Sequence, residues 1–148
     1  MLSSTSSAGF PSLLCSVGPH LCALPLVHVV ETMRPLPIVA IAGTPPFVLG
    51  MAVIRGGPVP VFSVSAVVGA SSAPPGRFVT IRVEARVVAL AVDAVEGVAT
   101  LDPSTLADVP PLLREASREV LQSVGALDAR LVVVLRTARL LPSLGPAS

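Results

Sequence analysis

The chain has 148 residues, of which 52% are hydrophobic and 13% are charged, with 16 prolines, no tryptophan and no tyrosine. This length allows one domain or two small intertwined ones. The formal net charge of +1 and the scarcity of aromatic residues argue against a nucleic-acid partner, which usually requires a basic stripe or aromatic stacking platforms.

Membrane-spanning segments are not expected either. The uncharged runs 35–54 and 56–76 are each long enough to cross a bilayer, but prolines and glycines interrupt both of them. The N-terminus lacks a basic n-region and is a poor signal peptide. We therefore expect a cytoplasmic protein without direct membrane insertion, whose serine-rich residues 1–11 form a disordered tail.

The charges are distributed unevenly along the chain. Residues 1–76 carry only Glu31, Arg34 and Arg55, and all other charged residues lie between Arg77 and Arg139. Either the first half is mostly core, with Ser, Thr and Pro on its surface, or it presents an apolar face to a partner. The sequence leaves both explanations open.

In chain order, residues 13–17 and 21–31 flank Gly18-Pro19 and are predicted to form a β-hairpin. A two-residue loop there places Cys15 opposite Cys22. Facing cysteines can be bridged when the geometry suits, but in a reducing cytoplasm they are better explained as two small buried hydrophobic residues.

The next segment contains an Arg-Gly turn between apolar strands. Residues 48–54 and 59–64 are predicted strands, joined through Arg55-Gly56-Gly57-Pro58. Arg55 is the only charged residue between Arg34 and Arg77. A single guanidinium amid apolar residues points to a protein partner more readily than to a reaction. The alternative is that Arg55 only holds its own turn in place.

The second half is also rich in predicted strands. They cover 78–84, 86–93, 94–101, 120–127 and 131–136, with a loop at 70–76 and short helical turns at 102–104, 112–119 and 137–141. No repeat of fixed period is visible in the sequence. Nine or ten strands with little helix predict an all-β barrel or a pair of barrels.

We find no catalytic, metal or cofactor constellation, so an enzyme is not expected. His20 and His28 lack partners at ligand spacing, and the absence of lysine excludes a Walker motif. Asp93 follows an apolar strand and is expected to act as a structural cap or turn residue. A small β-barrel enzyme or ligand carrier would require a deep polar pocket around Asp93 or His28.

Taken in order, several motifs form a known pattern. After the first hairpin come Val29 and Glu31, a P-x-F-x-x-G segment at 45–50, an R-G-x-x-x-P segment at 55–60, a V-D-x-V segment at 92–95, and RLVVVLRTARLL at 130–141. Each fragment is weak alone, but their order and spacing resemble the CheW family of adaptors. These adaptors couple bacterial chemoreceptors to the histidine kinase CheA.

The resemblance implies a fold of two intertwined small SH3-like β-barrels with short helical turns, here over residues 12–142, with 143–148 as a C-terminal tail. It implies a non-enzymatic scaffold in chemosensory signal transduction without cofactors or metals. The implied partners are the regulatory domain of a CheA-type kinase and the cytoplasmic hairpin tip of a chemoreceptor. The implied partner-binding residues are Val29, Glu31, Gly50, Arg55 and Gly56.

The chain departs from the family pattern at two positions of this region. Val53 stands where the family usually has Asn, and Ser63-Val64 stands where it usually has Asp-Leu. Loss of the Asn and the Asp together is consistent with a lost internal hydrogen-bond pair. The alternative function is therefore a divergent CheW-like module that binds only one partner, receptor or kinase, and tunes an alternative pathway.

Overall fold

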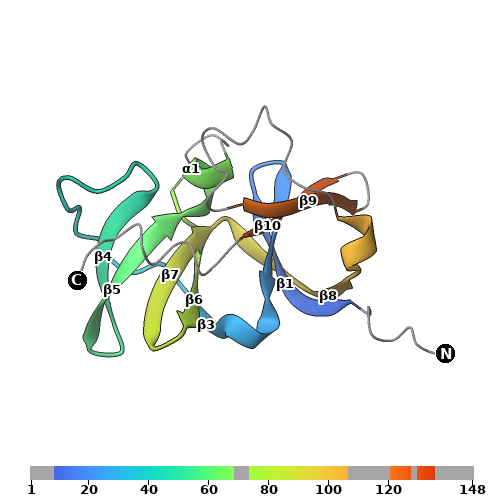
Figure 1. The fold of residues 1–148 in the computed structure, drawn as a ribbon. Helices are drawn as coiled ribbons and strands as arrows, with labels where there is room; N and C mark the ends of the chain where they lie inside the picture. The colour runs from blue at the N-terminus through green and yellow to red at the C-terminus, as the bar shows by residue number, and fades with distance from the viewer. Residues whose placement is uncertain (1–8, 69–73, 107–120, 128–129, 136–148) are drawn as a thin grey trace.

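The computed structural model describes residues 9–68, 74–106, 121–127 and 130–135, and these residues form two five-stranded sheets side by side (Figure 1). The first sheet has the strand order β8-β1-β2-β10-β9 and is called barrel A below. The second has the order β3-β6-β7-β5-β4 and is called barrel B. The expected all-β fold of two intertwined barrels is confirmed.

The strands run as follows: β1 (Phe10–Val17), β2 (His20–Pro25), β3 (Val29–Met33), β4 (Val48–Ile54), β5 (Gly57–Ser63), β6 (Arg77–Val83), β7 (Arg86–Val92), β8 (Ala94–Leu101), β9 (Leu121–Leu127) and β10 (Arg130–Leu135). One short helix, α1 (Val64–Val68), follows β5, and 3-10 turns occupy Leu26–His28 and Pro103–Thr105. None of the helices in the described residues is long and apolar enough to cross a membrane.

The chain passes between the barrels twice. Strands β1 and β2 belong to barrel A, β3 to β7 form barrel B, and β8 to β10 return to complete barrel A. The second passage is at Asp93, whose side chain accepts a hydrogen bond of 2.7 Å from the backbone N–H of Gly18. The structural role expected for Asp93 is therefore confirmed, because this bond ties the passage to the β1–β2 turn.

The two halves of the chain repeat each other in register. Cys15 pairs with Cys22 across the first hairpin, as predicted, and Ile81 pairs with Val88 at the corresponding place in the hairpin of β6 and β7. A β-bulge between Val29 and Glu31 in β3 recurs between Val95 and Gly97 in β8. No repeat of fixed period is visible in the sequence, because the pairing pattern repeats while the residue identities do not.

A core shared by the two barrels lies between them. It contains buried residues of both halves, including Cys15, Leu24, Val79, Leu90 and Val133. Separate clusters fill barrel B and barrel A. Cys15 and Cys22 are buried free thiols, and burial together with the nearby charge of Glu96 raises the pKa of Cys15 to about 12. The interpretation of both cysteines as small buried hydrophobic residues is confirmed.

Some predicted boundaries are wrong. Residues 21–31 form two strands separated by the turn Leu26–His28, so His28 ends a 3-10 turn and does not lie within a strand. This turn is where the chain leaves barrel A for barrel B. The helical turn after Asp102 is confirmed, since Asp102 accepts the N–H of Ser104. The predictions for 112–119 and 137–141 lie outside the described residues.

A candidate partner-binding surface at the turn between β4 and β5

The Arg-Gly turn is a tight two-residue loop. Ile54 pairs with Gly57, and Arg55 and Gly56 between them have φ angles of 54° and 82°. Two residues with positive φ are typical of the loops whose twist matches the twist of β-hairpins. A non-glycine residue rarely adopts this conformation, so the fold holds Arg55 at the tip of the hairpin at some cost in backbone energy.

Arg55 forms an ion pair with Glu31. The Nε and Nη2 groups of Arg55 donate hydrogen bonds of 2.9 and 2.6 Å to the two carboxylate oxygens of Glu31. Glu31 lies on β3 and Arg55 follows β4, and these strands are the two edges of the second sheet. The pair therefore links the edges of barrel B, which differs from the alternative in which Arg55 only holds its own turn.

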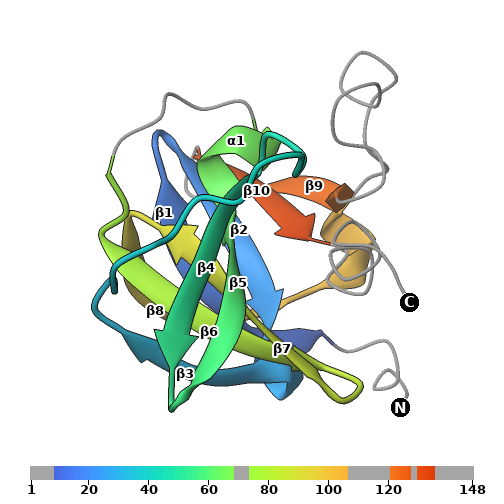
Figure 2. The ribbon, with the colours of Figure 1, turned by 90° about the vertical axis from the view of Figure 1, so that its left-hand side faces the viewer.

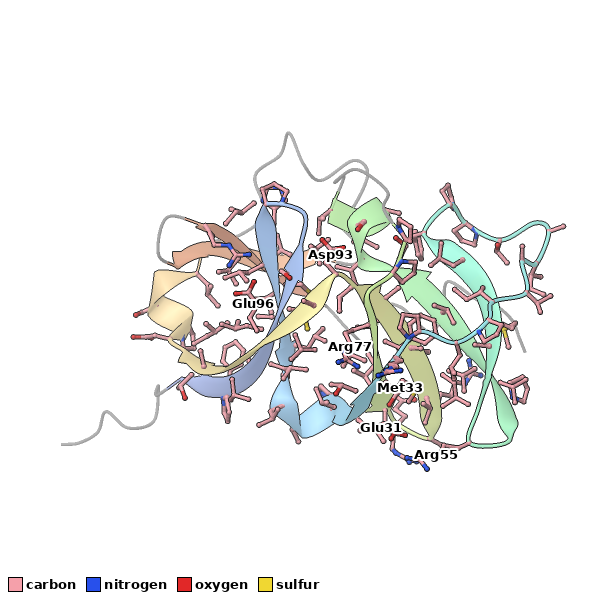
Figure 3. All side chains as sticks on the ribbon, turned by 180° about the vertical axis from the view of Figure 1, so that it is seen from behind. Glu31, Met33, Arg55, Arg77, Asp93 and Glu96 are labelled. Atoms are coloured by element: carbon pink, nitrogen blue, oxygen red, sulfur yellow. The ribbon has the colours of Figure 1, made fainter. Side chains whose placement is uncertain are left out.

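The two charges stabilise each other's ionised forms. Hydrogen bonding to Arg55 lowers the pKa of the Glu31 carboxyl, and the same bond raises the pKa of Arg55. The Arg55 side chain is nevertheless 77% exposed, whereas that of Glu31 is 26% exposed. Since Glu31 engages only one edge of the guanidinium, the remaining N–H groups of Arg55 face solvent at the outer end of the hairpin (Figure 3).

Exposed apolar side chains precede Glu31 in the sequence. Val27 is 85% exposed, and Val30, the bulged residue next to Glu31, is also exposed. Val29 lies between them and is half-buried against the shared core. Sequence reasoning selected Val29 and missed Val27 and Val30, because the 3-10 turn and the bulge break the alternation that assigns strand residues to faces.

The two predicted glycines have different roles. Gly56 has open space where a side chain would begin. Gly50 is buried on β4, and a Cβ there would collide with the backbone carbonyl of Val39. Val39 in turn exchanges two backbone hydrogen bonds with Met51, of 2.8 and 2.9 Å. The role of Gly50 is thus structural: the absence of a Cβ lets the segment after β3 lie against the edge of β4.

Barrel A also has an ion pair between strands that are not neighbours in the sheet, and the sequence did not reveal it. Nη1 of Arg130, on β10, donates a hydrogen bond of 2.9 Å to the carboxylate of Glu96 on β8. Both carboxylates of these pairs come from an edge strand that begins just after the chain has changed barrels. No sequence signal marks this pair, because its two residues are 34 positions apart and neither stands out within its own strand.

The two departures from the family pattern lie apart in the structure. Val53 faces Pro58 across the hairpin and is 69% exposed. Ser63 lies at the far end of β5, where its hydroxyl accepts a hydrogen bond of 3.1 Å from the N–H of Ala66. Their positions rule out a direct hydrogen-bond pair between them, so the idea that such a pair was lost is wrong.

Among the residues that the structure describes, this surface is accompanied by apolar side chains and not by a metal site. In the part of the chain that the structure describes, no group of three or more His, Cys, Asp or Glu side chains is arranged to hold a metal ion. The described residues that are large, apolar and exposed fall mostly in the first half of the chain, from Leu26 to Val53. The arrangement therefore offers an exposed guanidinium, with exposed apolar residues on the strands that carry the ion pair, which suits recognition of a protein.

Comparison with known proteins gives a consistent result. The CheW-like domain family matches residues 11–145. The chemotaxis protein CheW of Rhizobium meliloti (strain 1021) is 31% identical over 102 residues, which cover 67% of this chain and 66% of that protein, just under two thirds of its length. The crystal structure of the scaffolding protein TtCheW from Thermoanaerobacter tengcongensis has a similar fold, with a TM-score of 0.72 at 21% identity over 86% of this chain and 89% of that one. The chain therefore belongs to the CheW-like domain family.

Proposed function

We propose that this protein is a non-enzymatic scaffold that couples chemoreceptors to a CheA-type histidine kinase. The observation that carries the proposal is the exposed Arg55 guanidinium, which Glu31 holds at the hairpin tip. Membership of the CheW-like family supports it, as does the likeness to a CheW protein named for chemotaxis. The protein would act in the cytoplasm, beside the receptor arrays.

The chemistry of the surface fits protein recognition. A guanidinium whose orientation is fixed in advance loses little side-chain freedom when it grips a carboxylate or the carbonyl groups at a helix end. Val30 on the strand of Glu31 and Val53 on the strand that leads to Arg55 add exposed apolar area to the same two strands. Of the five residues that we propose for partner binding, Arg55 and Gly56 contact the partner, Glu31 orients Arg55, and Val29 and Gly50 support the strands beneath.

The proposed partners are the regulatory domain of the kinase and the cytoplasmic hairpin tip of a receptor. We predict that Arg55→Ala weakens binding to at least one of them by about tenfold, because it removes a charged group at the centre of the contact. Arg55→Lys keeps the charge but loses the planar fork, so an intermediate loss is expected. The measurement is calorimetric titration with each partner separately, since the chain has no Trp or Tyr to report on binding.

Arg130→Ala is the matched control, because it removes a similar ion pair from barrel A. Equal losses for Arg55→Ala and Arg130→Ala, or no loss in either, would remove Arg55 from the contact surface. Saturable binding of both wild-type partners supports the coupling function. Binding of only one partner would instead support the divergent module that engages receptor or kinase alone.

A further inference from the structure

A groove on barrel B is lined by the start of β7, by β4 and β5, and by residues of the segment before β4. The hairpin of β4 and β5 lies in front in Figure 2. Its volume is about 470 Å³, within the range of about 300 to 1,000 Å³ typical of binding pockets. Its walls are mainly apolar and include Met51, Pro58, Pro60 and Val88, with Arg86 as the charged residue. The groove contains neither Arg55 nor Glu31.

The internal repeat explains why the groove is open. In barrel A, β10 pairs with β2 through Val132, Val133 and Val134. The corresponding residues of β5 are Val59, Pro60 and Val61, and of these only Val61 pairs with β7. The strands β10 and β2 therefore pair over this stretch in barrel A, whereas β5 and β7 are separate over the corresponding stretch of barrel B. Pro60 stands there in the place of Val133.

The groove is poorly suited to an added β-strand. Pro58 and Pro60 carry no N–H, so this stretch of β5 cannot supply the regular ladder that an extra strand needs. The outer edge of β4 is already bonded to Val39 beside Met51. Recognition here must therefore use side chains, which is how a helix is bound in an apolar groove.

The charges on barrel B indicate the sign of the partner. Among the described residues, the arginines outside the two ion pairs are Arg34, Arg77, Arg82 and Arg86, and all lie on strands of barrel B or directly after one. The carboxylates on these strands and turns are Glu31, which is paired with Arg55, and Glu84. A partner that covers Arg86 as well as the groove gains most when it brings a carboxylate, because Arg86 would otherwise lose water without gaining a counter-charge.

We propose that this groove docks an amphipathic helix of a partner protein, with its apolar side chains in the groove and a bordering carboxylate on Arg86. The proposal concerns a surface separate from Arg55 and does not rest on the coupling of receptor and kinase. A failed titration at Arg55 and a failed titration at this groove are therefore distinguishable.

The experiment follows the methionine methyl groups of the full chain by NMR. The chain has three methionines, and Met51 lines the groove whereas Met33 packs against the interior of barrel B. The probe is a capped helical peptide with leucines at positions i, i+3, i+4 and i+7 bordered by glutamates. We expect the Met51 signal, assigned with Met51→Leu, to shift saturably while the Met33 signal stays in place.

Charge reversal tests the role of Arg86. Arg86→Glu should weaken peptide binding by about tenfold or more, and a peptide with Gln in place of Glu should bind the wild type with a similar loss. Arg82→Glu is the matched control, because Arg82 is also exposed on the hairpin of β6 and β7 but does not line the groove. Circular dichroism verifies that both variants are folded.

Three outcomes would overturn the proposal. Equal losses for the two arginine variants would indicate non-specific attraction to a basic surface. A Met51 signal that depends on protein concentration would assign the groove to a second copy of the chain. An NOE in the free protein from the Met51 methyl to a leucine of residues 136–148 would mean that the groove is filled by the chain itself.

Discussion

At Gly50, the absence of a Cβ lets Val39 lie against β4 and form its two bonds to Met51. Gly50 also has a φ of 144°, which side-chain-bearing residues rarely adopt. We expect Gly50→Ala to lower the free energy of unfolding by about 2 kcal/mol or more, since strain and collision act together. Urea unfolding followed by circular dichroism measures this.

Gly56→Ala is the control for this prediction. Gly56 also has a positive φ, of 82°, but nothing lies within contact distance of a Cβ added there. Its substitution should therefore cost only the backbone strain, about 1 kcal/mol. Equal losses at the two positions would show that the contact with Val39 does not matter for stability.

The sequence showed which residue to examine at this site but not how it is held. Arg55 stands out because no other charged residue lies near it in the sequence. Its partner Glu31 is 24 residues away and on the opposite edge of the sheet. Such a pair cannot be predicted from local sequence spacing, because spacing does not tell which strand edges lie close together in the folded barrel.

At the level of elements, the strands were predictable and the short helix was not. Runs of Val, Ile and Leu ended by Gly or Pro placed most strands to within two or three residues. The helix α1, with the sequence VSAVV, has β-branched residues at three of its five positions and reads as strand. Burial of Val64 and Val67 in the shared core, together with the Ser63 cap, overrides this preference.

The cap makes Ser63 a testable part of this element. Ser63→Ala removes the acceptor for the N–H of Ala66 and should lower the free energy of unfolding by about 1 kcal/mol. Ser63→Asp restores the residue that the resemblance leads us to expect here. It should leave stability almost unchanged, because Asp caps as well as Ser. Thermal unfolding of the three proteins compares them, and a loss in Ser63→Asp equal to that in Ser63→Ala would contradict the capping role.

At the level of the whole molecule, stability should depend weakly on pH through the Glu31–Arg55 pair. The pKa of Glu31 is lower in the folded protein than its ordinary value of 4.5, because Arg55 stabilises the carboxylate. The contribution of the ion pair to stability is therefore complete above pH 4.5 and is lost as the pH falls through the lower, folded value. Wild type and Glu31→Gln should differ in thermal midpoint at neutral pH and converge in acid.

Circular dichroism melts at several pH values measure this convergence. The difference is expected to be small, because the pair is exposed to solvent and salt screens it. Glu31→Asp is the control, since it keeps a carboxylate but shortens the reach to Arg55. A difference between wild type and Glu31→Gln that persists unchanged below pH 4.5 would contradict the assignment.

The architecture of the whole molecule was predictable only through the family resemblance. Strand count and turn spacing indicate a barrel or a pair of barrels, but they do not say which strands share a sheet. The parallel pairing of β10 with β2 joins segments far apart in the sequence. The repeat was hidden because corresponding positions, such as Cys15 and Ile81, share apolar character without sharing identity.

The order in which the strands leave the ribosome has a consequence for this protein. All five strands of barrel B have been synthesised once Val92 is complete, so it can close while the rest of the chain is still being made. The first hairpin, which is made earliest, must wait for β8 to β10 before its own barrel exists. Barrel B therefore provides the first folded surface against which Cys15, Cys22 and their neighbours can pack. The first hairpin is synthesised before barrel B, yet its own barrel is completed later.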